Sequence, residues 1–315
     1  ANAKGIGLTA LDRAIEDGRV GYGHVSAVID RDKGTAEIRV NGPSAMPPAG
    51  AAGVHAQGAA FWPLALAREL DDLILHLRAN EPRAGLWLIR AEGDPGKVEA
   101  YDRLLLDHAG DLLVREITLM WKRTLKRLDL SSRSIFALVE PGSCFTGTLL
   151  ELALAADRSY MLAGARQGDN RPPATVRLSE MNFIAYPASN GISRLAARWL
   201  GRPERLDELK GDIARDLDAE AAEAAGLVTL TPDDIDWEDE VRVAIEERTA
   251  FSPDALVGME ANLRFAGPET AETKIFGRLS AWQNWIFQRP NAVGDEGALK
   301  LYGSGRRGRF DKRRV

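Results

Sequence analysis

Gly147–Asp157 reads GTLLELALAAD, an almost unbroken apolar run with one carboxylate, Glu151, in its middle. The segment follows the fully apolar run Ile135–Val139 through a short turn, which predicts a buried strand and then a helix that begins at Gly147 or Thr148. The first N–H groups of a helix have no partner within it, and the helix dipole is positive there. The segment therefore predicts a strand-turn-helix unit whose helix start can hold an oxyanion, with an acid one turn away.

Strand-like and helix-like runs alternate on both sides of this segment. Two β-rich runs around Asp32-Lys33-Gly34 predict a hairpin, and apolar residues recur at helical spacing in two longer stretches. Repeated strand-helix-strand units predict an α/β fold in which helices pack outside a parallel sheet. The predicted elements are strands His24–Asp30, Thr35–Val40, Leu86–Ile89, Ile135–Val139 and Ser159–Leu162, and helices Pro63–Ala79 and Gly110–Leu128.

Composition divides the chain into two regions. Residues 41–58 are rich in Pro, Gly and Ala and predict a surface loop, and residues 1–23 are predicted to be an N-terminal extension. Beyond Pro232 the pattern is helical almost to the end. We therefore predict a core over residues 1–231 and a helical region with a basic tail over residues 232–315.

Charge and cysteine content limit the possible partners. The 315 residues include 46 acidic and 41 basic side chains, a net charge of -5 that argues against nucleic acid as a partner. Cys144 is the single cysteine, so no internal disulfide can form. No apolar run approaches the ~20 residues that a membrane-spanning helix needs. We expect no membrane partner and a cytoplasmic location, and the missing initiator Met suggests a piece of a longer protein.

The C-terminal tail carries the strongest run of positive charge. A solvated chain end explains this run, and contact with a phosphate-bearing ligand or an acidic partner is the sharper alternative. The tail also contains GSGRRG, Gly303–Gly308, but no strand precedes the motif, so it does not predict a dinucleotide site. The basic residues are Arg306, Arg307, Arg309, Lys312, Arg313 and Arg314.

Candidate catalytic residues are few. Glu180 ends the strand-like run Val176–Glu180, and parallel sheets bind ligands at the carboxyl ends of their strands. Glu151 and Glu180 are therefore the candidate acid/base pair. Cys144 has no base nearby in the sequence and is predicted to be a packing residue. No metal site is predicted, because the four histidines lie far apart: His24, His55, His76 and His108.

These segments, in this order, resemble the crotonase (enoyl-CoA hydratase/isomerase) superfamily. The resemblance covers roughly residues 25–230 and includes LWLIRAEGD (86–94), the helix near Asn190–Leu195 and AAEAAGLV (221–228). It implies a crotonase-like ββα spiral core followed by a C-terminal helical region. It also implies an acyl-CoA substrate and no cofactor beyond the CoA that the substrate carries.

The resemblance assigns roles to particular residues. Glu151 and Glu180 correspond to the two glutamates that serve hydratases as acid and base. Thr148, beside Gly147, corresponds to a glycine whose N–H stabilises the thioester oxyanion. The second N–H donor would be Tyr101, because Glu99-Ala100-Tyr101-Asp102 matches the family's A-G-x-D turn.

The chain departs from the family's glycine-rich pattern near these residues. Thr148 and Leu149 stand where the family has glycines, and so do Ala188 and Ser189 at the later turn. Backbone N–H donors survive such replacements, but Tyr101 and the new side chains would crowd a thioester that glycines admit. We expect both carboxylates to persist while the space around them is reduced.

A narrower resemblance concerns long ring-opening enzymes of aerobic benzoyl-CoA degradation, whose two halves each resemble crotonase. Residues 3–18, the hairpin, residues 282–305 and the basic terminus resemble their divergent second half. The activity that this implies is hydrolytic opening of an epoxide- or dihydrodiol-type benzoyl-CoA ring with release of formate. The implied partner is the N-terminal crotonase-like half of the same protein.

Three functions remain open at this point. The chain is an acyl-CoA lyase or hydrolase, a non-catalytic module that supports a catalytic half, or an enoyl-CoA hydratase/isomerase. We expect a homo-oligomer. If the chain is a non-catalytic module, Trp282, Trp285 and Phe287 are the candidate residues for its contact with the catalytic half. We also expect the isolated chain to bind CoA thioesters weakly or not at all.

Overall fold

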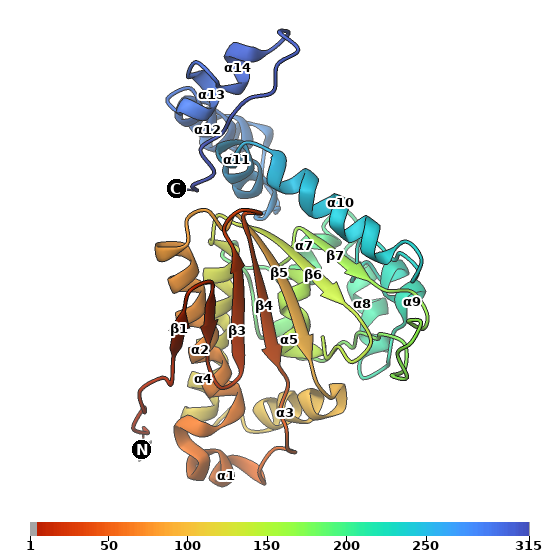
Figure 1. Ribbon diagram of the computed structural model, residues 1–315. Helices are drawn as coiled ribbons and strands as arrows, with labels where there is room; N and C mark the ends of the chain where they lie inside the picture. The colour runs from red at the N-terminus through yellow and green to blue at the C-terminus, as the bar shows by residue number, and fades with distance from the viewer. Residues whose placement is uncertain (1–4, 315) are drawn as a thin grey trace.

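The central sheet of the computed structural model, which describes residues 5–314, contains seven strands that neighbour one another in chain order (Figure 1). The first four strands pair antiparallel and the last four pair parallel, with β4 common to both parts. The strands are β1 Ala14–Glu16, β2 Arg19–Gly21, β3 Val25–Asp30, β4 Thr35–Asn41, β5 Leu86–Glu92, β6 Ser134–Val139 and β7 Arg158–Met161.

The predicted hairpin is confirmed as β3 and β4. Its register pairs Val25 with Val40 and Asp30 with Thr35, and buried residues alternate with more exposed ones along β3. The N-terminal extension differs from the prediction in part, because residues 14–21 form β1 and β2 and belong to the sheet. The first four residues of that extension lie outside the described residues.

Five helices carry most of the core (Figure 1). Helices α2 and α5 contact the strands on one face of the sheet and α4 packs on α2, whereas α1 and α3 lie beyond the lower ends of the strands and contact other helices. The two long helices match the predicted amphipathic stretches, and α5 begins at Gly147 as predicted. The short predicted strands are confirmed within a few residues at each end. The helices are α1 Gly50–Gln57, α2 Trp62–Asn80, α3 Pro95–Asp107, α4 Leu112–Asp129 and α5 Gly147–Leu154.

Two predicted irregular segments are helical instead. The predicted loop over residues 41–58 contains α1, in which alanines favour the helix and Val54 anchors it in the core. The predicted turn Glu99–Asp102 lies inside α3. That helix starts earlier because Asp94 caps it with its side chain and Pro95 suits its first turn.

Short helices and single bridges connect the sheet to the C-terminal region. An isolated bridge joins Tyr160 of β7 to Leu230, so the segment around residue 230 extends the sheet without forming a strand. A second bridge joins Arg177 to Thr146, the residue before α5, which lies outside the sheet. The short helices are α6 Met181–Ile184, α7 Arg194–Arg198, α8 Arg205–Leu209 and α9 Ala219–Ala224.

The C-terminal region is helical, as predicted, and α10 covers the other face of the sheet. Trp237, Val241 and Ala244 of α10 pack on residues of β5, β6 and β7, which confirms an α/β core with a C-terminal helical region. No helix within residues 5–314 is long and apolar enough to cross a bilayer. The helices are α10 Trp237–Ala250, α11 Pro253–Leu263, the π-helical segment Thr273–Leu279, α12 Ser280–Ile286, α13 Pro290–Val293 and α14 Ala298–Leu301.

The basic tail is anchored to the core at its end. Arg314 is only 6% exposed, and its guanidinium lies 3.1 Å from a carboxylate oxygen of Glu260 on α11 and donates to the Ser134 hydroxyl at the start of β6. The interpretation of the whole tail as a solvated chain end is therefore wrong for Arg314. It holds for Arg306, Arg307, Arg309 and Arg313, which are exposed.

Replacing Arg314 with Met is expected to lower the free energy of unfolding by roughly 2 kcal/mol, because Glu260 would lose its nearest buried cation. The loss is moderate since Arg248 and Arg264 each remain 3.9 Å from Glu260. Urea unfolding of the full chain measures the effect. Arg313→Met, which changes an exposed neighbour, should stay within about 0.5 kcal/mol of wild type, and an equal loss in both variants would contradict the buried-pair explanation.

Candidate functional site

The start of α5 is the predicted oxyanion site, and its amides already have partners. The N–H of Gly147 donates to the carbonyl of Arg177 at 3.0 Å, and the N–H of Thr148 donates to the carboxylate of Asp102 at 2.9 Å. The next two N–H groups both donate to the carbonyl of Thr146. A thioester oxygen would therefore have to displace a protein acceptor to reach these donors.

Asp102 takes the position of an anion at this helix start. Its side chain is 2% exposed and also accepts hydrogen bonds from the Thr148 hydroxyl and, at 2.8 Å, from the Ser179 hydroxyl. The Tyr186 hydroxyl lies 3.0 Å from the Thr148 hydroxyl and extends the buried network. Burial raises the pKa of Asp102 to about 6, although the bonds from Thr148 and Ser179 favour the charged form.

Gly147 lets Asp102 come this close. Its φ of +46° lies in the left-handed region, and a Cβ at this position would overlap both the Asp102 carboxylate and the Ser179 hydroxyl. The glycine at the predicted oxyanion site thus makes room for the protein's own carboxylate.

Glu151, the predicted acid, is held in a buried ion network. Its two carboxylate oxygens accept from the Asn182 amide and the Arg194 guanidinium, each at 2.8 Å. The same guanidinium pairs with Asp129 at 2.6 Å, and Glu151 is 1% exposed. Burial raises the pKa of Glu151 and of Asp129, and the Arg194 charge opposes both shifts. The carboxylates of Glu151 and Asp129 therefore both have hydrogen-bond and charge partners inside the protein.

Glu180 lies apart from Glu151. It is exposed and lines a cavity of about 60 Å³ together with Asp102 and Ser179. Glu151 does not line this cavity, so the structure does not bring the two predicted acids to one hollow. The volume is far below the ~300–1,000 Å³ typical of small-molecule pockets.

Tyr101 is a core residue. Its ring packs at centroid distances of 5.5 Å from Phe61 and 5.1 Å from Trp62. Its N–H lies in the interior of α3, beyond the first turn, where an N–H bonds to the carbonyl four residues earlier. The turn that follows β5 is instead at Gly93, whose N–H donates to the carbonyl of Gly142 at 3.1 Å.

Cys144 is buried beside the glycines of two crossing segments. A Cβ on Gly42 would lie 3.1 Å from the Cys144 sulfur, and one on Gly93 would lie 3.4 Å from it. Burial raises the pKa of the thiol to about 12. A thiol that stays protonated is a poor nucleophile, which fits a packing role. Within residues 5–314 no group of three or more His, Cys, Asp or Glu side chains could hold a metal ion.

Sequence reasoning missed most of the polar residues around α5. Asn182 in α6 and Arg194 at the start of α7 bind Glu151 directly, and Asp129 at the end of α4 joins the network through Arg194, so the network comes from three separate segments. Asp102 was noticed only as the last letter of a motif. The sequence signal for Glu151 was a charged residue within an apolar run. A buried carboxylate needs a hydrogen-bonding or cationic partner, but the run does not identify which residue that is.

Comparisons with known proteins agree with this fold. No family model matches the chain. The chain is 52% identical over all of its 315 residues to benzoyl-CoA-dihydrodiol lyase of Aromatoleum evansii, and it spans 56% of that protein's length. Solved structures with the same fold include the enoyl-CoA hydratase of Geobacillus kaustophilus (TM-score 0.63, 15% identity, 93% of this chain and 98% of that one). Another is an enoyl-CoA hydratase/carnitine racemase of Magnetospirillum magneticum (TM-score 0.63, 17% identity, 95% and 97%).

These similarities confirm the crotonase-like fold with its C-terminal helical region. They also confirm the likeness to benzoyl-CoA-dihydrodiol lyase at the level of sequence. The roles assigned to Glu151, Glu180, Tyr101, Thr148 and Gly147 stay predictions.

Proposed function

We propose that this chain, a crotonase-fold relative of benzoyl-CoA-dihydrodiol lyase, is the structural half of an enzyme that opens the ring of a benzoyl-CoA derivative. In this proposal the remaining length of the protein carries the acyl-CoA site, and this chain supports its fold and assembly. The relative supports the substrate class by its name, and the chain's 56% share of that relative leaves room for a second half.

One observation favours a structural role over a catalytic one. Asp102 places a buried carboxylate on the amide of Thr148, where an oxyanion-type site would place the substrate oxygen. Loss of one oxyanion donor costs ~10²–10³ in kcat. In this chain the Thr148 N–H already donates to Asp102, and the nearby cavity of about 60 Å³ is too small for a CoA thioester.

The proposal predicts that this chain alone does not bind benzoyl-CoA with micromolar affinity. Calorimetric titration of the chain with benzoyl-CoA should give no saturable heat, because the amides of Gly147 and Thr148 are occupied. The full-length protein should bind it.

Two substitutions in the full-length protein separate the structural role from a catalytic one. Glu180→Gln changes an exposed residue and should leave kcat for ring opening within about twofold, since a proton-transferring carboxylate would instead contribute ~10²–10⁴-fold. Glu151→Gln should act on the unfolding midpoint more than on the kcat of the folded fraction. A micromolar affinity of the isolated chain that Glu151→Gln abolishes would overturn the proposal and favour the lyase or hydrolase alternative.

A further inference from the structure

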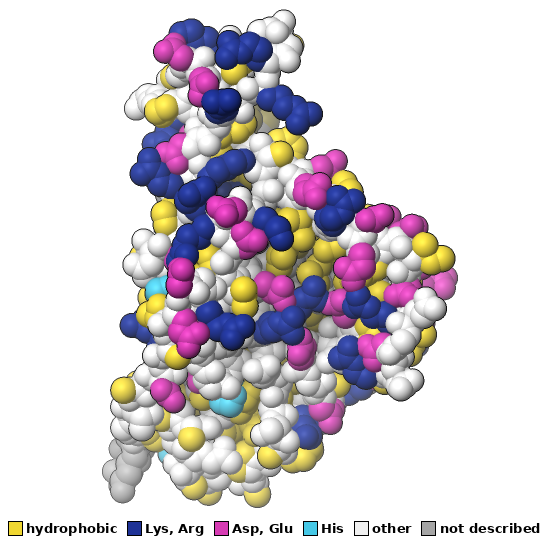
Figure 2. Space-filling model, in the orientation of Figure 1, with side chains coloured by type: hydrophobic (Ala, Val, Ile, Leu, Met, Phe, Trp, Pro, Cys, Tyr) yellow, Lys and Arg dark blue, Asp and Glu magenta, His cyan; other side chains and the backbone are white. Residues whose placement is uncertain are grey.

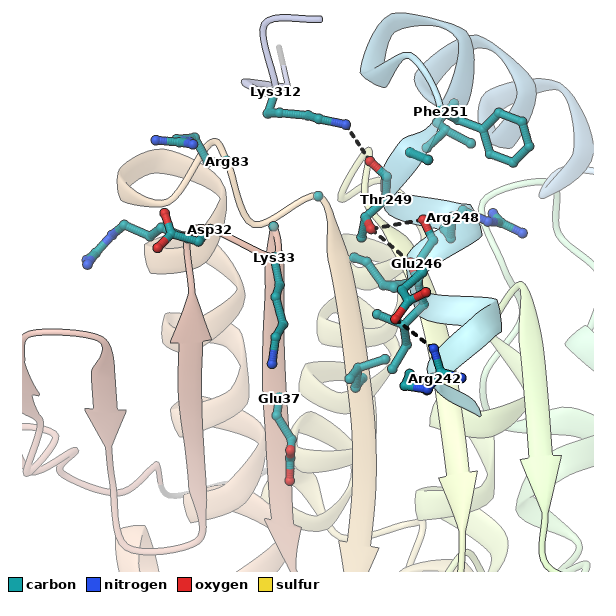
Figure 3. Close-up of a pocket in the computed structure, with 18 of the residues that line it drawn as sticks. Asp32, Lys33, Glu37, Arg83, Arg242, Glu246, Arg248, Thr249, Phe251 and Lys312 are labelled. Atoms are coloured by element: carbon teal, nitrogen blue, oxygen red, sulfur yellow. Dashed lines mark hydrogen bonds and ion pairs between the residues drawn. The ribbon is translucent and has the colours of Figure 1, made fainter. Parts of the chain in front are cut away.

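A second, larger cavity lies on the opposite face of the sheet from α5. Its volume is about 660 Å³, within the ~300–1,000 Å³ of small-molecule pockets. It opens between β4, β5, helix α10 and the segment that begins α11 (Figure 3). The apolar cluster beneath α10 contains residues of β5, β6 and β7 and, among the described residues, none of β4. The helix therefore leaves part of this face uncovered.

The floor and one wall of this cavity are apolar. Leu86, Leu88 and Leu138 contribute from the strands, and Ile245 and Leu256 contribute from α10 and α11. Figure 2 shows hydrophobic side chains at the bottom of the hollow beside α10, with Lys, Arg, Asp and Glu side chains around it. Such a lining favours an apolar body, because removing apolar area from water contributes about 25 cal/mol per Å².

The charges around the cavity are predominantly positive. Eight Lys and Arg side chains line it, against four Asp and Glu side chains. Three of those acids are already paired, Glu246 with Arg242 at 3.0 Å, Glu37 with Arg90 at 3.3 Å, and Glu238 with Arg166. Six of the eight cations also lie within 4.0 Å of a carboxylate. The positive charge left for a ligand comes from Arg83 and Lys312, which have no carboxylate of residues 5–314 within 4.0 Å, and it favours an anion.

Lys312 supplies a cation without an acidic partner. Its ammonium group donates to the main-chain carbonyl of Thr249 (Figure 3), and no carboxylate within residues 5–314 lies within 4.0 Å of it. Burial lowers the pKa of this ammonium, and the neighbouring charge of Arg314 lowers it further. An ammonium has three donors, so two remain for a ligand.

We propose that this cavity binds a small organic anion, with an apolar body such as an aromatic ring against Leu88 and Ile245 and one carboxylate or phosphate group on Lys312. The apolar floor would contact the apolar part of the ligand, and the ammonium group of Lys312 would pair with its negatively charged group. The site shares no residue with the network around Asp102 and Glu151, so it stands independently of the proposed function.

The test uses the full chain and the fluorescent anion 1-anilinonaphthalene-8-sulfonate, which joins an aromatic body to one negative group. Its fluorescence should rise to saturation at one site. Lys312→Gln should weaken the affinity about tenfold, which corresponds to ~1.4 kcal/mol. Lys210→Gln removes an exposed lysine that does not line the cavity and should leave the affinity unchanged. Circular dichroism should show that each variant is folded.

A second variant and two competitors sharpen the test. Ile245→Glu places a carboxylate inside the cavity and should abolish binding even if Lys312→Gln has a small effect. Displacement of the probe by benzoate would identify a carboxylate ligand, and displacement by phenyl phosphate a phosphate ligand. Failure of both to displace it, or wild-type affinity in Lys312→Gln and Ile245→Glu alike, would overturn the proposal.

Discussion

The variant Arg194→Met is expected to lose about 3–5 kcal/mol of unfolding free energy at neutral pH, the usual result of removing one partner from a buried ion pair. Methionine keeps the apolar stem of the side chain but leaves Glu151 and Asp129 without their shared cation. Both carboxylates are buried, so neither can recover its hydration. Chemical denaturation followed by circular dichroism measures the loss.

The effect of Arg194→Met should depend on pH in a defined direction. Without the guanidinium, the folded-state pKa values of Glu151 and Asp129 rise above their already raised levels. A carboxyl group with a raised folded pKa costs no stability while both states are protonated, and it lowers stability progressively as pH rises from its unfolded-state pKa to its folded-state pKa. The variant should therefore recover part of its stability as pH falls from 7 toward 4.

Controls for this variant come from the same part of the chain. Arg202→Met changes an arginine whose side chain is 65% exposed and should cost less than about 0.5 kcal/mol. The double variant Arg194→Met with Glu151→Gln should lose less than the sum of the single losses, because the second change removes an unpaired charge. Strict additivity, or a loss that does not change with pH, would show that the network is not the cause.

Replacing Asp102 with Asn is expected to change the pH dependence of stability more than stability itself. The folded-state pKa of Asp102 is about 6, above the ordinary value of 3.8. The folded protein therefore holds this proton more tightly than the unfolded chain does, and Asp102 lowers the unfolding free energy as pH rises from about 4 to 6. The difference amounts to about 3 kcal/mol. Asparagine cannot ionise, so the variant should lack this decline.

Unfolding free energies at pH 4, 5, 6 and 7 for wild type and Asp102→Asn test this prediction. The variant should gain relative to wild type across that range, while its amide oxygen still accepts from Thr148. Asp107→Asn on the same helix changes an exposed carboxyl and serves as the control. Parallel curves for wild type and Asp102→Asn would mean that the carboxyl is not buried as described.

Local patterns predicted most of the strands and the long helices. The hairpin β3–β4, the apolar strands β5 and β6 and the start of α5 follow from periodicity and turn residues within a few positions of each element. The errors are local as well. In α1 an alanine-rich segment was assigned to a loop because of its glycines, and in α3 a family motif was placed over a helix whose own cap, Asp94, lies earlier.

The arrangement around the candidate site could not be predicted in the same way. The sequence identified Gly147, Thr148 and Glu151 and the reduced space near them. The closing partners, Asp102 and Arg194, lie 46 and 43 residues from the groups that they bind, and nothing local pairs them. Glu151 and Glu180, the candidate acid/base pair, do not line one cavity, and their relative placement depends on where the segment after residue 176 returns.

The chain-order arrangement of the sheet has a consequence for folding kinetics. Each strand pairs with the strand made just before it, so pairing can advance one neighbour at a time from the β3–β4 hairpin. The parallel pairs need loops of tens of residues to close and should form later than the hairpin. Substitutions in β3 and β4 should then slow refolding, whereas substitutions in α10, which packs on the finished sheet, should mainly speed unfolding.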